Sequence, residues 1–128
     1  MAYAAGEIAS TGARVQKFTG SADVAKGAVA TVTPAAASTV ATCAEDGAGP
    51  FAVTIEAIES GATGRAVTKG EVAVDCSGNC YTGAVVTGSG GKVKECSTDP
   101  SGNYIKPLGR MVVGAADGAV GVVDVWGA

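Results

Sequence analysis

The chain has 128 residues and a net charge of −3, with 25 Ala, 20 Gly, 18 Val and 12 Thr but one Leu and no His. The length predicts a single domain, and a hydrophobic content of 47% excludes a disordered polyanion. Without His, many catalytic and metal-binding chemistries lose their usual side chain, so we expect a protein that is not an enzyme and has no cofactor. No basic cluster stands out and no apolar run approaches the ~20 residues of a membrane span, so we expect neither nucleic acid nor membrane as a partner.

Residues 1–20 mix Ala, Gly and Thr with four scattered large side chains, Tyr3, Ile8, Val15 and Phe18. Gly6 and Gly12 weaken any helix there, because glycine is a poor helix former. No basic region followed by a long apolar stretch is visible, so we expect no secretory signal. We interpret residues 1–20 as an extended arm and residues 21–128 as the folded domain.

From residue 28 onwards, short apolar stretches alternate with turn signals, as strands at regular spacing do. Val and Thr are stiff at χ1 and favour sheet over helix. The expected strands are Ala28–Thr33, Ser38–Cys43, Phe51–Ala57, Gly64–Lys69, Glu71–Asp75, Gly83–Thr87, Lys92–Cys96, Leu108–Val113 and Ala119–Trp126. Turn chemistry separates them, including Gly-rich segments at 45–50 and 88–91. Together these features predict an all-β fold.

Period-2 alternation suggests which faces of the strands are buried. From Phe51 to Ile55 the odd positions are apolar, and the alternation places the even positions Thr54 and Glu56 on the opposite face. Such patterns in many short pieces predict a small antiparallel β-barrel or sandwich with one wet face on each sheet. A core made mainly of Val and Ala is thin, which favours an oligomer or docking on a larger partner.

The four cysteines, Cys43, Cys76, Cys80 and Cys96, allow several states. The Cys76–Cys80 pair is a C-x3-C, which matches neither the C-x2-C knuckles of a zinc ribbon nor the redox C-x-x-C. Disulfides, a zinc-stabilised module and free buried thiols all remain open. If disulfides form, the favoured pairings are Cys76 with Cys80 or Cys43 with Cys96.

Other candidate chemistry is sparse. The carboxylate pair Glu56 and Glu59 and the pair Glu45 and Asp46 lie in or beside polar turns, so we expect them on the solvated surface. Serines have no His partner, and no G-x-S-x-G nucleophile elbow occurs. Trp126 follows a run of Val and is expected to be a core side chain or an anchor between subunits.

Residues 51–74, FAVTIEAIESGATGRAVTKGEVAV, combine an apolar strand, a short Gly turn and a second strand ending in Gly-x-Val. A hairpin around residues 88–91, the strand PLGRMVV at 107–113, a turn at 116–118 and a closing strand at 121–126 follow. This pattern, over residues 26–126, resembles the small bacteriophage capsid decoration (cement) proteins. The cysteines and the insert-like segment Asp99–Lys106 depart from it.

The resemblance implies a β-barrel or tulip-like domain that binds the exterior of an assembled icosahedral capsid and stabilises subunit junctions. Its partner would be the major capsid protein, its oligomer a trimer, and its location the virion surface after synthesis in the host cytoplasm. The arm would order only on the lattice, with Tyr3, Ile8, Val15 and Phe18 as its contacts and Trp126 as a further one. The alternative is a surface-exposed or secreted β-sandwich that binds carbohydrate or a cell surface.

Overall fold

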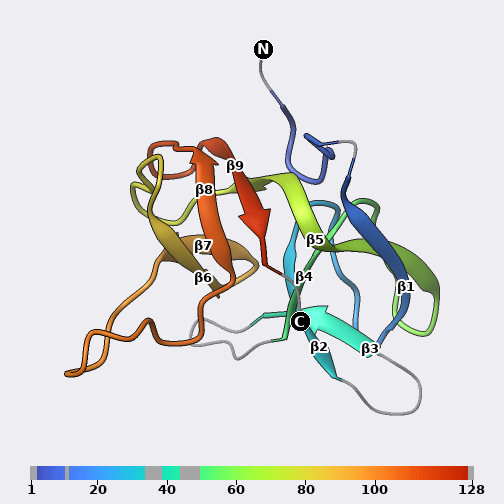
Figure 1. Cartoon of the computed structure of the whole chain (residues 1–128). Helices are drawn as coiled ribbons and strands as arrows, with labels where there is room; N and C mark the ends of the chain where they lie inside the picture. The colour runs from blue at the N-terminus through green and yellow to red at the C-terminus, as the bar shows by residue number, and fades with distance from the viewer. Residues whose placement is uncertain (1–2, 11, 34–38, 44–49, 127–128) are drawn as a thin grey trace.

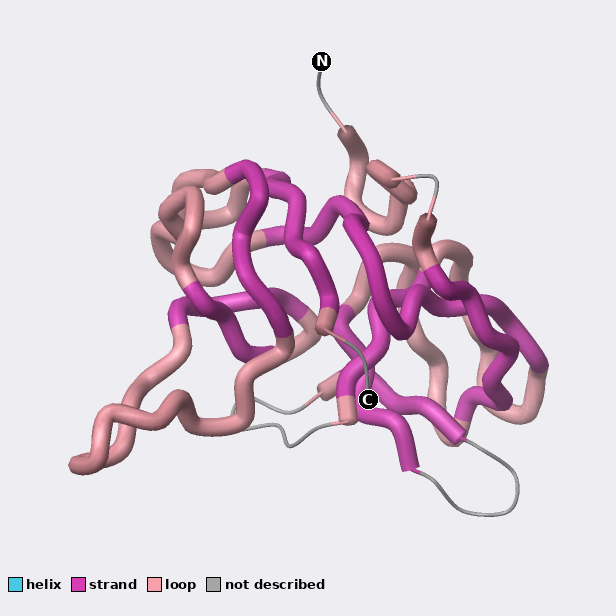
Figure 2. The backbone as a smooth tube through the Cα atoms, in the orientation of Figure 1, coloured by secondary structure: helices cyan, strands magenta, loops and turns pink. Residues whose placement is uncertain are grey.

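The computed structural model describes residues 3–10, 12–33, 39–43 and 50–126, and in them it consists of strands and loops (Figures 1 and 2). The strands are β1 (Arg14–Gly20), β2 (Val29–Thr33), β3 (Thr39–Thr42), β4 (Phe51–Thr54), β5 (Thr63–Asp75), β6 (Val85–Ser89), β7 (Lys92–Glu95), β8 (Gly109–Val113) and β9 (Val120–Val125). In these ranges no helix is long and apolar enough to span a membrane. The expected all-β fold is confirmed, whereas most of the turn predicted at 45–50 lies outside the described residues.

Five of the strands close into a small barrel. Their order is β1-β3-β2-β4-β5, and β1 also pairs with β5 to complete the ring. The β1–β3 pairing is parallel and the other pairings in the ring are antiparallel, so the barrel is mixed. Closure pairs the edges that β1 and β5 would otherwise leave open along this part of the sheet.

The remaining four strands extend from β5 in the order β5-β9-β8-β6-β7, with antiparallel pairings throughout. This second sheet curls back towards its start, because Cys76, just after β5, bridges to Val93 of β7. The predicted hairpin at 88–91 is confirmed: Ser89 pairs with Lys92, and the two glycines between them both have positive φ. Two such residues are what a type I′ turn requires.

The long strand β5 joins the two halves of the molecule. The sequence predicts two strands separated by a turn at Gly70, but the structure has one continuous strand of 13 residues that bends there. Gly70 has a φ of +115°, and a Cβ on it would lie 2.7 Å from the Cα of Ala13. Residues before the bend pair with β1 and β4, and residues from Gly70 onwards pair with β9. A glycine in a strand pattern here marks a change of partner and not a chain reversal.

The N-terminal residues differ from the expected extended arm. Residues 14–20 form β1, a strand that the sequence pattern did not predict, and Phe18 is only 5% exposed inside the barrel. Further upstream, Gly6 N donates to Ala73 O, Ala73 N donates to Glu7 O, and Ala9 N donates to Glu71 O. The segment therefore supplies backbone partners to a stretch of β5 that β1 does not reach, and its described part lies against the domain (Figure 1).

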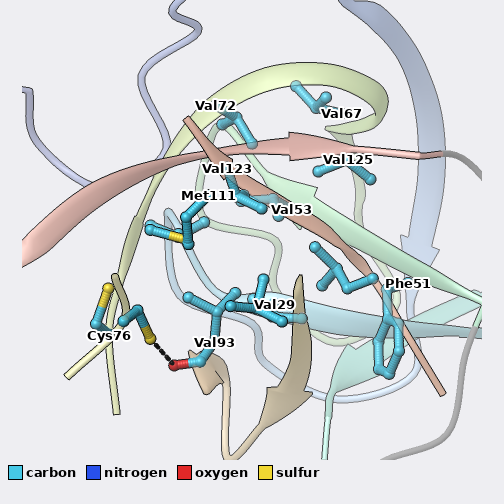
Figure 3. Packing of buried hydrophobic residues seen from close by; sticks show 14 of the residues in the cluster. Val29, Phe51, Val53, Val67, Val72, Cys76, Val93, Met111, Val123 and Val125 are labelled. Atoms are coloured by element: carbon cyan, nitrogen blue, oxygen red, sulfur yellow. Dashed lines mark hydrogen bonds between the residues drawn. The ribbon is translucent and has the colours of Figure 1, made fainter. Parts of the chain in front are cut away.

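Two buried clusters explain why so many strands are apolar on both faces. One fills the barrel and includes Phe18, Ala30, Ala52 and Ala66; the other lies between the barrel wall and the second sheet and includes Phe51 (Figure 3). Because β4 separates the two, all four of its residues are buried. The predicted wet face of this strand is therefore wrong.

Thr54, which the alternation placed on that wet face, is fully buried at the end of β4. Its hydroxyl donates to Ala25 O at 2.6 Å and accepts from Ala28 N at 3.1 Å. Both bonds are internal, so the hydroxyl needs no water to satisfy its polar atoms.

The barrel interior is narrow and is lined mainly by small side chains. Ala30, Ala52 and Ala66 have no exposed surface, and Ile58, 1% exposed, packs with them. The segment carrying Ile58 is held by reciprocal backbone hydrogen bonds with Val24, at 2.8 and 2.9 Å. The Ala-rich composition thus matches a five-stranded barrel, whose interior has little room for longer side chains.

Candidate functional site

Of the carboxylates considered for acid–base chemistry, Glu56 and Glu59 do not form a reactive site, and Glu45 and Asp46 lie outside the described residues. Glu56 Oε2 lies 2.9 Å from Arg65 Nε and also accepts the Arg65 backbone N–H at 2.8 Å. The hydrogen bond from the Arg65 side chain lowers the pKa of Glu56. Glu56 and Glu59 are not buried, in agreement with the expected solvated surface. A lowered pKa on an exposed carboxylate keeps it charged at neutral pH, the opposite of what a general acid needs.

The four thiols are free in this structure, so neither favoured disulfide is present in it. Cys43 Sγ accepts from Gly91 N at 3.4 Å, and Cys96 Sγ donates to Ile105 O at 2.9 Å. Cys76 and Cys80 lie together at the edge of the larger core, beside Val93. Burial raises the pKa of all four thiols, with that of Cys80 raised to about 12. Among the described residues, no group of three or more His, Cys, Asp or Glu is placed to hold a metal ion.

Exposed apolar side chains are the remaining candidates for function, because large exposed hydrophobes gathered on one surface mark contact sites. They occur in three regions of the described chain. The exposed large residues are Ile8, Val15, Tyr81, Tyr104, Ile105, Val112, Val113, Val120 and Trp126.

The first region, here called the Trp126 surface, consists of Tyr104, Ile105, Arg110 and Trp126. Trp126 is 43% exposed, with the Arg110 guanidinium carbon 6.0 Å from the centre of its ring. Arg110 Nη1 also donates to Gly83 O at 2.7 Å, which fixes the guanidinium beside the ring. The expectation that Trp126 fills the core is therefore wrong, and its exposure is compatible with the alternative role as an anchor.

A protruding hairpin carries Tyr104 and Ile105, both exposed, at the same end of β8 and β9 as Trp126. Asp99 Oδ1 accepts the N–H groups of Ser101 and Asn103, both at 2.9 Å, and Thr98 bridges to Tyr104. The hairpin projects from the body between β7 and β8 (Figure 1). The second half of the hairpin leads into Leu108, whose carbonyl accepts the Trp126 N–H at 3.1 Å, so hairpin and tryptophan lie at the same end of β8 and β9. The insert-like segment Asp99–Lys106 was the sequence signal for this feature.

A second region lies at the opposite end of β8 and β9, where Val113 ends one strand and Val120 begins the other. Tyr81, 65% exposed, lies beside it, since Cys80 bridges to Ala115 in the loop that joins the two strands. A cavity of about 350 Å³ opens there and is lined by Asn79, Cys80, Tyr81, Thr82, Gly114, Ala115 and Ala116. The lining carries no charged side chain.

The third region holds the side chains predicted as arm contacts. Ile8 and Val15 are exposed, Tyr3 is partly exposed, and Phe18 is buried in the barrel. Ile8 bridges to Val72 and Val15 pairs with Val67, so both are attached to β5. The structure does not bring these residues together with Trp126 into one site, and burial removes Phe18 from any surface.

Comparison with known proteins gives a likeness in fold. No protein-family model matches the chain, and no curated protein sequence matches it. A solved structure described as the N base of head fiber gp8.5 in bacteriophage phi29 superposes with a TM-score of 0.64. The match covers 88% of this chain and 93% of that chain at 14% identity. The chain shares the fold of this head fiber base. The superposition establishes the fold, and because the sequence identity is this low, function has to be argued separately.

Proposed function

We propose that the chain is a structural protein of a bacteriophage head, which binds the exterior of the icosahedral capsid and stabilises junctions between major capsid protein subunits. The observation that carries this proposal is the fold likeness to the phi29 head fiber base, because it spans nearly the whole of both chains. The pattern resemblance of residues 26–126 to capsid decoration proteins supports it from the sequence. The proposal requires no catalytic residue and no cofactor.

The Trp126 surface is the best-suited capsid contact in the described chain. Trp, Tyr and Arg are the residues enriched at binding hot spots, and this surface carries one of each beside Ile105. Arg110 is already held over the Trp126 ring, so little side-chain entropy is lost when the pair docks. Ile8 and Val15 supply a separate, weaker set of contacts. Each subunit adds modest area, and the repeated lattice supplies avidity, most effectively for a trimer.

Co-sedimentation with empty shells tests the proposal. The shells are assembled from the major capsid protein encoded in the same genome, and the fraction of this protein that pellets is measured against its concentration. We expect saturable binding to the shell exterior and a rise in the temperature at which the shells fall apart. Failure to bind these shells, together with specific binding to a glycan array, would favour the carbohydrate-binding alternative instead.

Single variants distinguish the surfaces. Trp126→Ala removes a hot-spot side chain, and a loss of about 2 kcal/mol would weaken shell binding roughly 30-fold. The matched control is Tyr81→Ala, since Tyr81 is also an exposed aromatic but lies at the other end of β8 and β9. We expect the control to bind within a factor of about two of wild type. Equal losses in both variants would contradict the assignment of the contact to the Trp126 surface. Light scattering on the free protein tests the trimer.

A further inference from the structure

Cys76 and Cys80 flank a three-residue loop that connects the end of β5 to the rest of the second sheet. Both side chains are buried, while Gly78 and Asn79 between them are exposed. Gly78 has a φ of +75°, which reverses the chain tightly and returns the second cysteine towards the first. Both cysteines lie against the same residue of β7, because Cys76 bridges to Val93. Cys80 Sγ also approaches Val93 O, at 3.6 Å, and Figure 3 shows Cys76 next to Val93.

Backbone hydrogen bonds hold the two cysteines in this arrangement independently of their side chains. Cys76 N donates to Ala119 O at 3.0 Å, and Cys80 N donates to Ala115 O at 2.9 Å. Between them, Gly78 N donates to Asp117 Oδ1 at 2.8 Å. The loop is thus bound on both sides to the loop between β8 and β9, and the thiols are oriented before any reaction occurs.

The other pairing considered from the sequence does not fit this fold. Cys43 lies next to Gly91, at the turn that begins β7, whereas Cys96 follows the far end of that strand. Five extended residues at about 3.3 Å each separate Gly91 from Cys96 by roughly 16 Å. A disulfide needs Cα atoms within about 7 Å, so Cys43 and Cys96 cannot be joined without unfolding β7.

We propose that Cys76 and Cys80 form an intramolecular disulfide when the protein meets a low-molecular-weight disulfide such as oxidised glutathione. A virion protein meets such oxidants once it leaves the reducing interior of its host, and in this respect alone the inference rests on the proposed function. The bond would fix the turn that closes the second sheet, because Cys76 bridges to Val93 of β7.

The reaction is an ordinary thiol–disulfide exchange in two steps. One cysteine thiolate attacks a sulfur of oxidised glutathione, breaks its S–S bond and releases one glutathione, which leaves a mixed disulfide. The second cysteine thiolate attacks the cysteine sulfur of that mixed disulfide, forms the Cys76–Cys80 bond and releases the second glutathione. The two cysteines lose two electrons to glutathione, and their two protons are taken up by the released thiolates.

The environment of the pair makes this oxidation slow. Burial is the main cause that raises the pKa of Cys80 to about 12, and it also raises the pKa of Cys76. Thiolate is therefore scarce at neutral pH, and exchange is faster in mild alkali. Cys80 is 1% exposed, so an oxidant reaches its thiol only when the loop opens, beside the cavity of about 350 Å³ that Cys80 helps to line.

Peptide mapping of the whole protein tests the inference. Trypsin cleaves after Lys69 and Lys92, so Cys76 and Cys80 lie in one peptide, residues 70–92, while Cys43 and Cys96 lie in separate peptides, residues 27–65 and 95–110. The purified protein is incubated with oxidised glutathione in mild alkali, unfolded, alkylated and digested. We expect the 70–92 peptide to be lighter by two hydrogen atoms and to carry no alkyl group. Two alkyl groups or bound glutathione on this peptide, or cross-linking of the other two, would overturn the inference.

Thermal unfolding provides a second readout that shell binding does not affect. Closing a loop of this size should raise the unfolding temperature of the oxidised protein by roughly 5 to 10 °C over the reduced protein. The matched control is Cys80→Ala, in which one thiol of the pair remains and the oxidant should produce no such rise. Cys76→Ala serves if that variant does not fold. An equal rise in wild type and control would refute the disulfide while leaving the proposed capsid role untouched. A protein that forms the disulfide but fails to bind shells would refute the proposed capsid role and leave the disulfide inference standing.

Discussion

Ile58 should be the side chain on which the small barrel depends most, and a paired substitution can show it. Ile58 is 1% exposed, and it packs in a cluster whose other members include Ala30, Ala52 and Ala66. Ile→Ala changes in protein cores cost about 2 to 5 kcal/mol, depending on how far the surroundings collapse into the cavity. These alanines carry only a methyl group, which cannot swing into the cavity, and the strands around them are hydrogen-bonded, so we expect Ile58→Ala to lose about 4 kcal/mol.

Gly64 provides the second half of the experiment. A Cβ at this position would collide with the Ile58 side chain, and Gly64 does not have positive φ. Gly64→Ala alone should therefore overpack the barrel and cost about 1 to 3 kcal/mol. In the Ile58→Ala background the two colliding atoms, Cγ1 and Cδ1, are gone and only the Cβ, 3.3 Å away, remains, so the same substitution should cost much less. The coupling between the two sites should then reach about 1 to 2 kcal/mol.

Equilibrium unfolding in urea measures all four proteins of this cycle, with the slope checked for two-state behaviour. Gly12→Ala is the matched control, because a Cβ on Gly12 meets nothing within 4 Å. It should leave the free energy of unfolding unchanged or slightly raised. Additive losses in the double variant would refute the reasoning, since they would mean that Ile58 does not occupy the space above Gly64.

Three further variants probe other parts of the fold. Gly88→Ala would place a Cβ 2.7 Å from Phe51 Cε1, and we expect a loss of about 1 to 3 kcal/mol in urea unfolding; an unchanged midpoint would contradict the packing of β6 on the barrel. Thr54→Val leaves the partners of a buried hydroxyl unsatisfied and should cost about 1 to 3 kcal/mol by the same measurement. The lowered pKa of Glu56 stabilises the fold above the unfolded value of about 4.5 and loses this effect as the pH falls through the lowered value. Glu56→Gln should accordingly be less stable than wild type in urea unfolding at pH 7, and the difference should vanish in acid. Equal stability of the two proteins at pH 7 would mean that the ion pair with Arg65 contributes nothing.

The sequence predicted most strands because turn residues separate them. Eight of the nine strands in the described part of the chain overlap expected ones, and the Gly-Gly hairpin between β6 and β7 occurs where it was expected. β1 was missed because its side chains up to Lys17 are exposed and mostly polar, so residues 14–20 resemble a loop in composition. Its place in the barrel depends on pairing with residues about fifty positions away, which no local pattern reports.

The candidate site was less predictable than the fold. Trp126 was singled out by residue type, but its exposure depends on where β9 ends relative to β8, and this is a tertiary property. Arg110 was not singled out, because nothing in its neighbourhood in the sequence indicates that it lies over the tryptophan ring. Phe18 was placed in an arm because the strand that carries it was not recognised.

The same arrangement accounts for the composition and for the available surface. The barrel interior combines four Ala with Phe18, Ile58 and three Val, and Val is the commonest residue in the layer between its wall and the second sheet. β4 lies between these two buried clusters and has no face left for a partner. In the region of β8 and β9, apolar side chains are left exposed at the two strand ends and not along an open sheet edge. Contact through such ends is compact and leaves the barrel walls intact. A surface of this kind suits repeated attachment to a lattice, where many modest contacts act together.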